Sequence, residues 1–121
     1  MTTLKITTDN KVSVIDLDFK DFKAIQREIG GYFECVKTQR LWDYFKAPVM
    51  MLVDEEGLIK GLPFNAVASA FYGFDKHGCM IAGDMILGLA LGEDIVGLGN
   101  SDSEQWMKKL LKDFPMLERG E

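Results

Sequence analysis

The sequence has few residues of the types that bind metals. It contains one histidine, His77, and two cysteines, Cys35 and Cys79, among 121 residues. A structural zinc site takes four ligands, so these three scattered side chains cannot supply a usual set. Cys35 and Cys79 are far apart in apolar surroundings, which favours two buried, reduced thiols over a disulfide. We therefore expect neither a metal nor a cofactor.

Long apolar runs are also missing. No stretch approaches the length that crosses a bilayer, and the first residues lack the basic and then apolar layout of a signal peptide. We therefore expect no membrane association and a cytoplasmic location. A chain of 121 residues can bury a core unaided, and we expect one domain over residues 1–115 followed by a frayed tail over residues 116–121.

Clusters of basic residues are the third absence. The chain carries 19 acidic and 14 basic residues, a formal net charge of −5, and its lysines and arginines are dispersed. Nucleic-acid surfaces depend on clustered lysine and arginine, so we expect no nucleic-acid partner. A protein that mimics DNA should carry ordered rows of carboxylates, and these acids are scattered, which favours a simple role in solubility.

A catalytic arrangement cannot be argued from the spacing of nucleophiles and bases. His77 lies in a turn between Lys76 and Gly78, which is typical of an exposed residue rather than of a general base. The glycines match no nucleotide-binding loop. The sequence therefore leans against an enzyme and names no catalytic residue.

The most informative stretch is residues 47–66. Residues 48–53 (PVMMLV) form a continuous apolar run, which predicts a well-buried strand. Residues 54–57 (DEEG) have the composition of a tight reversal, and residues 58–60 (LIK) would return as the second strand of a hairpin. Pro63 lacks the N–H that a ladder needs, so pairing should end there. Asn65 then either caps the next segment as a corner lock or offers its amide to the edge of a ligand.

The flanking segments predict an α+β fold. Alternating apolar residues predict strands over residues 4–7 and 12–17, and an apolar segment predicts a strand over residues 32–37. Asp18 should cap a first helix beginning near Phe19, with a buried stripe of Phe22, Ile25 and Ile29. Residues 66–72 could be helix or strand, since their apolar positions fit either.

The last helix is predicted by a capping box over residues 101–104 (SDSE). A stripe of Trp106, Leu110 and Phe114 should be buried, and Pro115 should end the helix. We expect a mostly antiparallel sheet of five or six strands, with the first and last helices packed on one face.

Residues 38–46 (TQRLWDYFK) are unusually aromatic for a connection. Such a segment either packs over the core as a lid or binds a ligand or protein partner. In the binding interpretation, Trp42 or Tyr44 would stack on a flat ring and Arg40 could reach a phosphate, while Pro63 and Asn65 would hold and read its polar edge. Two chains could close a pocket that one leaves open, so this interpretation includes a homodimer.

The sequence Gly61-Leu62-Pro63-x-Asn65, after the predicted hairpin, resembles the motif of an uncharacterised domain family that is common in phages, plasmids and integrative elements of bacteria. The similarity covers most of the chain, through residues 29–34, 81–88 and 94–98. The resemblance implies a mobile-element context, hence the cytoplasm of the host cell if a phage encodes the chain. It implies no established activity.

Three hypotheses of function follow. The first is a non-catalytic accessory protein that binds a small nucleotide-like ligand and sequesters a host nucleotide immune signal; it predicts a pocket with aromatic walls and a few polar groups. The second is a protein that inhibits a host defence factor by direct binding, which predicts an exposed apolar patch. The third is a small enzyme acting on a nucleotide-like substrate, which needs a shifted pKa in a cleft.

Overall fold

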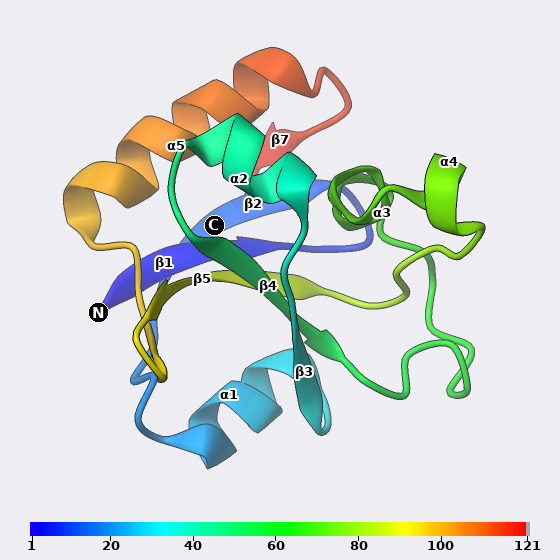
Figure 1. Ribbon diagram of the computed structural model, residues 1–121, viewed down its shortest axis with the longest axis horizontal. Helices are drawn as coiled ribbons and strands as arrows, with labels where there is room; N and C mark the ends of the chain where they lie inside the picture. The colour runs from blue at the N-terminus through cyan, green and yellow to red at the C-terminus, as the bar shows by residue number, and fades with distance from the viewer. Residues whose placement is uncertain (121) are drawn as a thin grey trace.

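A computed structural model describes residues 1–120 of the chain (Figure 1). The elements follow one another in this order: β1 (Thr2–Ile6), β2 (Lys11–Asp16), α1 (Phe22–Ile29), β3 (Phe33–Val36), α2 (Gln39–Phe45), β4 (Val49–Asp54), α3 (Ala66–Tyr72), α4 (Phe74–His77), β5 (Met85–Leu91), β6 (Asp94–Val96), α5 (Asn100–Asp113) and β7 (Glu118–Arg119). The fold is therefore α+β, as the sequence predicts.

The strands form one mixed sheet in the order β3-β4-β5-β1-β2-β7, with β6 paired to β5 outside this path. Every pairing is antiparallel except that of β2 with β7, which is parallel. The prediction of a mostly antiparallel sheet is confirmed, but the sheet has seven strands rather than five or six. The additional strands are β6 and β7, which are too short to show a period in the sequence.

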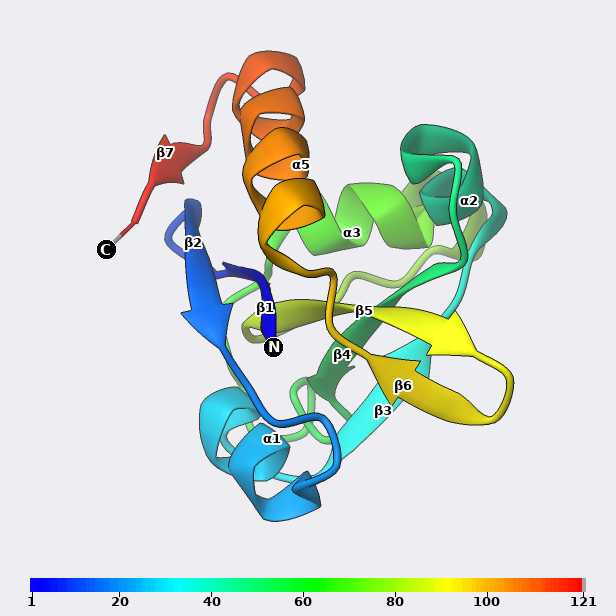
Figure 2. The ribbon, with the colours of Figure 1, turned by 90° about the vertical axis from the view of Figure 1, so that its left-hand side faces the viewer.

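Helices cover both faces of the sheet, so the prediction that the first and last helices share one face is wrong. Figures 1 and 2 show α1 on one side of the sheet and α2, α3 and α5 on the other. The alternating side chains of β4 divide accordingly: Met50 and Leu52 join the core under α1, whereas Met51 and Val53 join the core under the other helices. A strand buried on both faces reads as a continuous apolar run, which is the pattern of residues 48–53.

The predicted hairpin over residues 48–60 is also wrong. β4 pairs with β3 and β5, and residues 55–61 form consecutive turns rather than a returning strand. Leu58 and Ile59 are 53% and 85% exposed. The buried Asp54 carboxylate accepts hydrogen bonds from the Glu56 N–H (2.8 Å) and from Lys60 Nζ (2.7 Å), so it fastens this loop instead of opening a second strand.

The helix boundaries differ from those expected at the first and last helices. α1 begins at Phe22 and is capped by Asp21, not by Asp18, and Phe22 is 60% exposed while Ile25 and Ile29 are buried. Burial of these two isoleucines is worth about 1.5–3 kcal/mol each, which holds a helix that is too short to be stable alone. α5 already includes Ser101, so the predicted capping box does not form, and no side chain caps this helix.

The last helix otherwise packs on its predicted stripe. Met107 and Leu110 are fully buried, and Trp106 and Phe114 are partly buried against the same core. Residues 116–120 do not have the frayed structure expected of them, because Leu117 is buried and β7 pairs with β2. Cys35 and Cys79 are free but exposed, which corrects the expectation of two buried thiols. Within residues 1–120, no helix is both long enough and apolar enough to cross a membrane.

Candidate functional site

The aromatic segment predicted as a lid or a binding surface forms the short helix α2. Thr38 caps it: the Thr38 Oγ1 atom accepts from the Leu41 N–H (3.2 Å) and donates to the Phe71 carbonyl (2.8 Å). The same hydroxyl therefore starts α2 and ties it to the end of α3. Leu41 and Phe45 are buried in the core beneath, and this packing stabilises a helix too short to persist alone.

The turn of α2 decides which predicted site residues meet. Successive residues of an α-helix are about 100° apart, so Arg40 and Tyr44, four residues apart, lie on the same flank. Trp42 lies about 200° around the helix from Tyr44, on the opposite flank, and is 50% exposed. The structure thus brings Arg40 and Tyr44 together and separates Trp42 from them.

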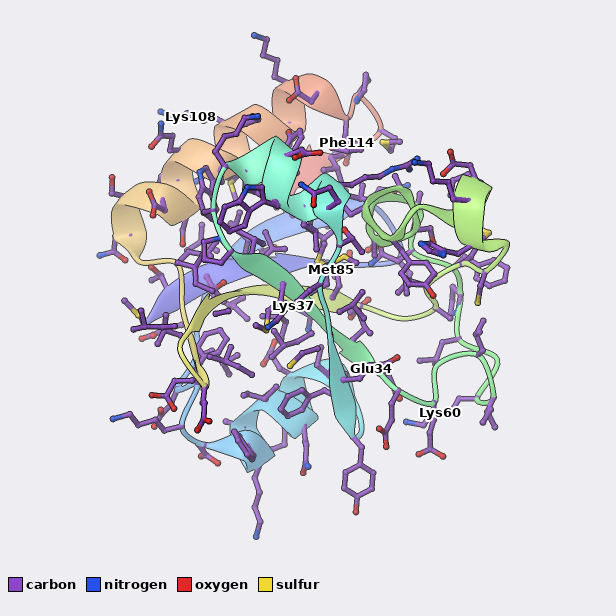
Figure 3. All side chains as sticks on the ribbon, in the orientation of Figure 1. Glu34, Lys37, Lys60, Met85, Lys108 and Phe114 are labelled. Atoms are coloured by element: carbon purple, nitrogen blue, oxygen red, sulfur yellow. The ribbon has the colours of Figure 1, made fainter. Side chains whose placement is uncertain are left out.

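Arg40 and Tyr44 line an open groove of about 390 Å³ between α2, α3 and the end of α5. We call it the aromatic groove; its lining residues are Arg40, Asp43, Tyr44, Ala70, Phe71 and Phe114. Phe114, labelled in Figure 3, follows the last residue of α5. The centroid of its ring lies 6.0 Å from the ring centroid of Tyr44 and 5.4 Å from that of Phe71. The ring centroids of Tyr44 and Phe71 are 5.1 Å apart. Three mutually packed rings, from α2, α3 and the residue that follows α5, thus form the walls.

Arg40 supplies the positive charge of the groove. Its Nη1 atom donates to the Ala70 carbonyl (3.0 Å) and its Nη2 atom to Asp75 Oδ2 (2.9 Å). The hydrogen bond from Arg40 holds the pKa of Asp75 below its ordinary value. A guanidinium has five N–H donors, and these two contacts leave donors free to bind an anion at the rim.

Tyr44 supplies a ring whose hydroxyl is fixed. The hydroxyl donates to Asp113 Oδ2 (2.8 Å), and Lys109 Nζ lies 4.3 Å from the ring centroid while donating to the Tyr44 carbonyl (2.8 Å). Burial raises the pKa of Tyr44 far above its ordinary value, and the hydrogen bond to Asp113 raises it further. The phenol therefore stays protonated at neutral pH and acts as a donor and an apolar wall, not as a base.

Asn65 lies at the other end of α3, and its side chain is fully buried. Its Oδ1 atom accepts from the Ala68 N–H (3.1 Å), and its Nδ2 atom donates to the carbonyls of Ile6 (3.0 Å) and Gly83 (3.1 Å). Of the two roles weighed for Asn65, this geometry is that of the cap and corner lock, because both amide hydrogens are used inside the protein. Residues 66–72, left open as helix or strand, are the helix that it caps.

Pro63 belongs to the same corner. Its carbonyl accepts from the Gly83 N–H (2.9 Å), and neither Pro63 nor Asn65 lines the aromatic groove. The ligand-binding role predicted for these two residues stays a prediction to which their position adds no support.

The sequence did not single out Phe71 or Phe114 as site residues. Phe71 is one of the apolar positions that fit either a helix or a strand over residues 66–72, and Phe114 is the last residue of the predicted core stripe. The only local signal was that Phe114 precedes Pro115, where a helix ends and a side chain is no longer covered on all sides. Their meeting with Tyr44 depends on tertiary packing between residues far apart in the chain.

A second cavity, of about 320 Å³, lies over the ends of β3 and β4. Its lining includes the carboxylates of Glu34, Asp54 and Glu55 beside Tyr72 and Ile81. Such a surface disfavours a phosphate, so a nucleotide-like ligand suits the aromatic groove better. Over the part of the chain that the structure describes, no three His, Cys, Asp or Glu side chains are grouped so that they could hold a metal ion.

The comparisons with known proteins give one family. A family model described as a domain of unknown function (DUF3846) matches residues 1–112. No curated protein and no solved structure matches the chain.

Proposed function

We propose that this chain, which belongs to the DUF3846 family, is a non-catalytic accessory protein of a phage or other mobile element that binds a small, flat, nucleotide-like ligand. The observation that supports the proposal is the aromatic groove, in which Arg40 stands beside the packed rings of Tyr44, Phe71 and Phe114. Ligand pockets commonly combine such apolar walls with a few polar groups.

Each part of the groove has a role in this proposal. A ring of the ligand stacks on the exposed edge of the aromatic cluster, which is worth about 1–3 kcal/mol for each base. Arg40 binds a phosphate oxygen with the donors that Asp75 and Ala70 leave free, and Asp43 accepts a hydrogen bond from an amino group of the ring.

In the biological form of the proposal, the ligand is a host nucleotide immune signal in the cytoplasm, and binding it counters a host defence. The open side of the groove leaves room for a second copy, so a homodimer would enclose the ligand more fully.

Calorimetric titration with cyclic nucleotides and with ADP-ribose-type nucleotides tests the proposal. Tyr44→Ala and Arg40→Ala should each weaken binding about tenfold or more, since each removes a ring or a charge from the groove. Trp42→Ala is the matched control, because Trp42 is an aromatic residue of the same helix on the opposite flank. Absence of heat with every nucleotide, or an equal loss in Trp42→Ala, would refute the groove as the site.

A second function, direct inhibition of a host defence factor, is favoured by a separate observation. Leu58, Ile59 and Phe64 are exposed apolar side chains within one loop region. Ile59→Asp should abolish inhibition in this case while leaving nucleotide binding unchanged, and Arg40→Ala should do the reverse. A defence-inhibition assay with both variants distinguishes the two functions.

A further inference from the structure

The edge strand β3 has backbone groups that the sheet does not use. Within residues 1–120, β3 is the last strand of the sheet on its side and pairs only with β4. The Glu55 N–H donates to the Tyr32 carbonyl (3.1 Å), so Tyr32 and Glu55 are a hydrogen-bonded pair of this antiparallel ladder. Such pairs alternate along a ladder, which places Glu34 and Val36 in the next hydrogen-bonded pairs. The N–H and C=O groups of Phe33 and Cys35 therefore point outward, away from β4.

The two sides of this edge differ in chemistry. Glu34 and Val36 face the second cavity, which the Glu55 carboxylate also lines. Figure 3 labels Glu34 on β3. On the other side, the Phe33 ring contacts that of the exposed Phe22 edge-on at 5.9 Å between ring centroids. An added strand would thus meet carboxylates on one side and apolar rings on the other.

We propose that β3 receives an extended segment of a partner protein as an additional strand, and that the segment alternates basic and apolar side chains. The backbone of the segment hydrogen-bonds to Phe33 and Cys35. Its basic side chains enter the acidic side near Glu34 and Glu55, and its apolar side chains lie against Phe22 and Phe33. Backbone pairing gives affinity in this mode of recognition, and the pockets beside the edge give specificity.

Charge argues for such a partner over a second copy of this chain. The chain has a net charge of −5, and β3 itself carries Glu34. Pairing two β3 strands would bring the Glu34 carboxylates of both copies to the same acidic cavity, and like charges on neighbouring strands destabilise pairing. The proposal goes beyond the aromatic groove, since no residue is shared between the two sites.

The probe is a short acetylated peptide of alternating valine and lysine, measured by fluorescence anisotropy against the full chain. A peptide of the same composition with its lysines in one block has the same charge but cannot place them on one side of a strand. The alternating peptide should bind, and hydrogen exchange at the Phe33 and Cys35 amides should slow on binding. Equal binding of both peptides, or no binding at about 1 mM, overturns the proposal.

Two variants test the backbone and the charge separately. Cys35→Pro removes an outward N–H without removing a bond to β4, as an edge position allows, and should abolish binding; Cys35→Thr keeps the N–H and should bind normally. Glu34→Lys should weaken binding about five- to tenfold, whereas Glu104→Lys, with the same change in net charge at an exposed position of α5, which packs on β1 and β2, should not.

Self-association provides the last outcome. If the chain forms dimers in solution that Cys35→Pro converts to monomers, the edge is an interface between copies and the proposal is wrong. Circular dichroism of each variant, together with its urea midpoint, establishes that a loss of binding is not a loss of folding.

Discussion

The two ends of α3 use their side chains in opposite ways. At its start, Asn65 is enclosed and three hydrogen bonds occupy its amide. At its end, Phe71 belongs to a groove that is open, beside an Arg40 guanidinium with donors to spare. A buried polar group without hydrogen-bond partners costs free energy, which explains why both amide hydrogens and the oxygen of Asn65 are hydrogen-bonded. A seven-residue helix thus carries a hydrogen-bonded anchor at one end and forms part of the wall of an open groove at the other.

The largest expected effect is at the anchor. Asn65→Ala removes the cap of α3 and the two hydrogen bonds that Nδ2 donates to the carbonyls of Ile6 and Gly83. The free energy of unfolding should fall by about 3 kcal/mol, combining a lost cap with two lost buried hydrogen bonds. Urea denaturation measures it. Asn100→Ala is the control, since this exposed side chain makes one bond, with Thr2, and should cost less than about 1 kcal/mol. If Asn65→Ala and Asn100→Ala lowered the free energy of unfolding by similar amounts, Asn65 would not be the anchor of α3.

A smaller effect is expected in the groove from Tyr44→Phe. The substitution removes the hydroxyl that donates to Asp113 but keeps the ring, so the free energy of unfolding should fall by about 1 kcal/mol. Nucleotide affinity should change less than about threefold, because the stacking surface remains. Tyr32→Phe removes the same atom from an exposed ring and should be neutral in both measurements. A large loss of affinity in Tyr44→Phe would show that the hydroxyl, rather than the ring, binds the ligand.

The smallest change in the free energy of unfolding is expected from the Arg40–Asp75 ion pair at the rim of the aromatic groove, and it depends on pH. Arg40 lowers the pKa of Asp75, so the ion pair stabilises the fold above the unfolded-state pKa of about 3.9. This contribution is lost as the pH falls through the lower folded-state pKa. The stability difference between the wild type and Asp75→Asn should therefore be larger at pH 7 than at about pH 3. In an Arg40→Ala background, Asp75→Asn should change the free energy of unfolding by the same amount at both pH values. If the change still depended on pH there, the dependence would come from a group other than Arg40.

Local patterns predicted the buried strand at residues 48–53 but not its neighbours. The reversal signal of residues 54–57 suggested a hairpin, whereas the buried Asp54 carboxylate binds Lys60 and folds the segment into a closed loop. The actual partners, β3 and β5, come from distant parts of the chain. Composition and turn residues do not predict which strands pair over such distances. The distribution of the helices between the two faces of the sheet depends on these pairings.

The candidate site was predictable to the extent that it is helical. Arg40 and Tyr44 are four residues apart, so any helix over residues 39–45 places them on one flank. Phe71 and Phe114 reach the same place only because α3 and α5 pack on the same face as α2. The cap position of Asn65 follows from the sequence, but its complete burial and its bonds to the carbonyls of Ile6 and Gly83 depend on tertiary packing that no local pattern encodes.

The position of β5 in the sheet also has a consequence for the order of folding. β5 lies between β4 and β1, and it supplies Met85 and Leu87 to one core and Ile86 to the other. The β1–β2 hairpin is local and can form as soon as it leaves the ribosome, but neither core can close until β5 has been made. From Asp16 to Leu91, at about 5–20 residues per second, that interval is on the order of 4–15 s. Throughout it the apolar face of β1, and that of β4 once residue 54 has been made, lacks its central partner, so the nascent chain exposes apolar surface until Leu91 has been added.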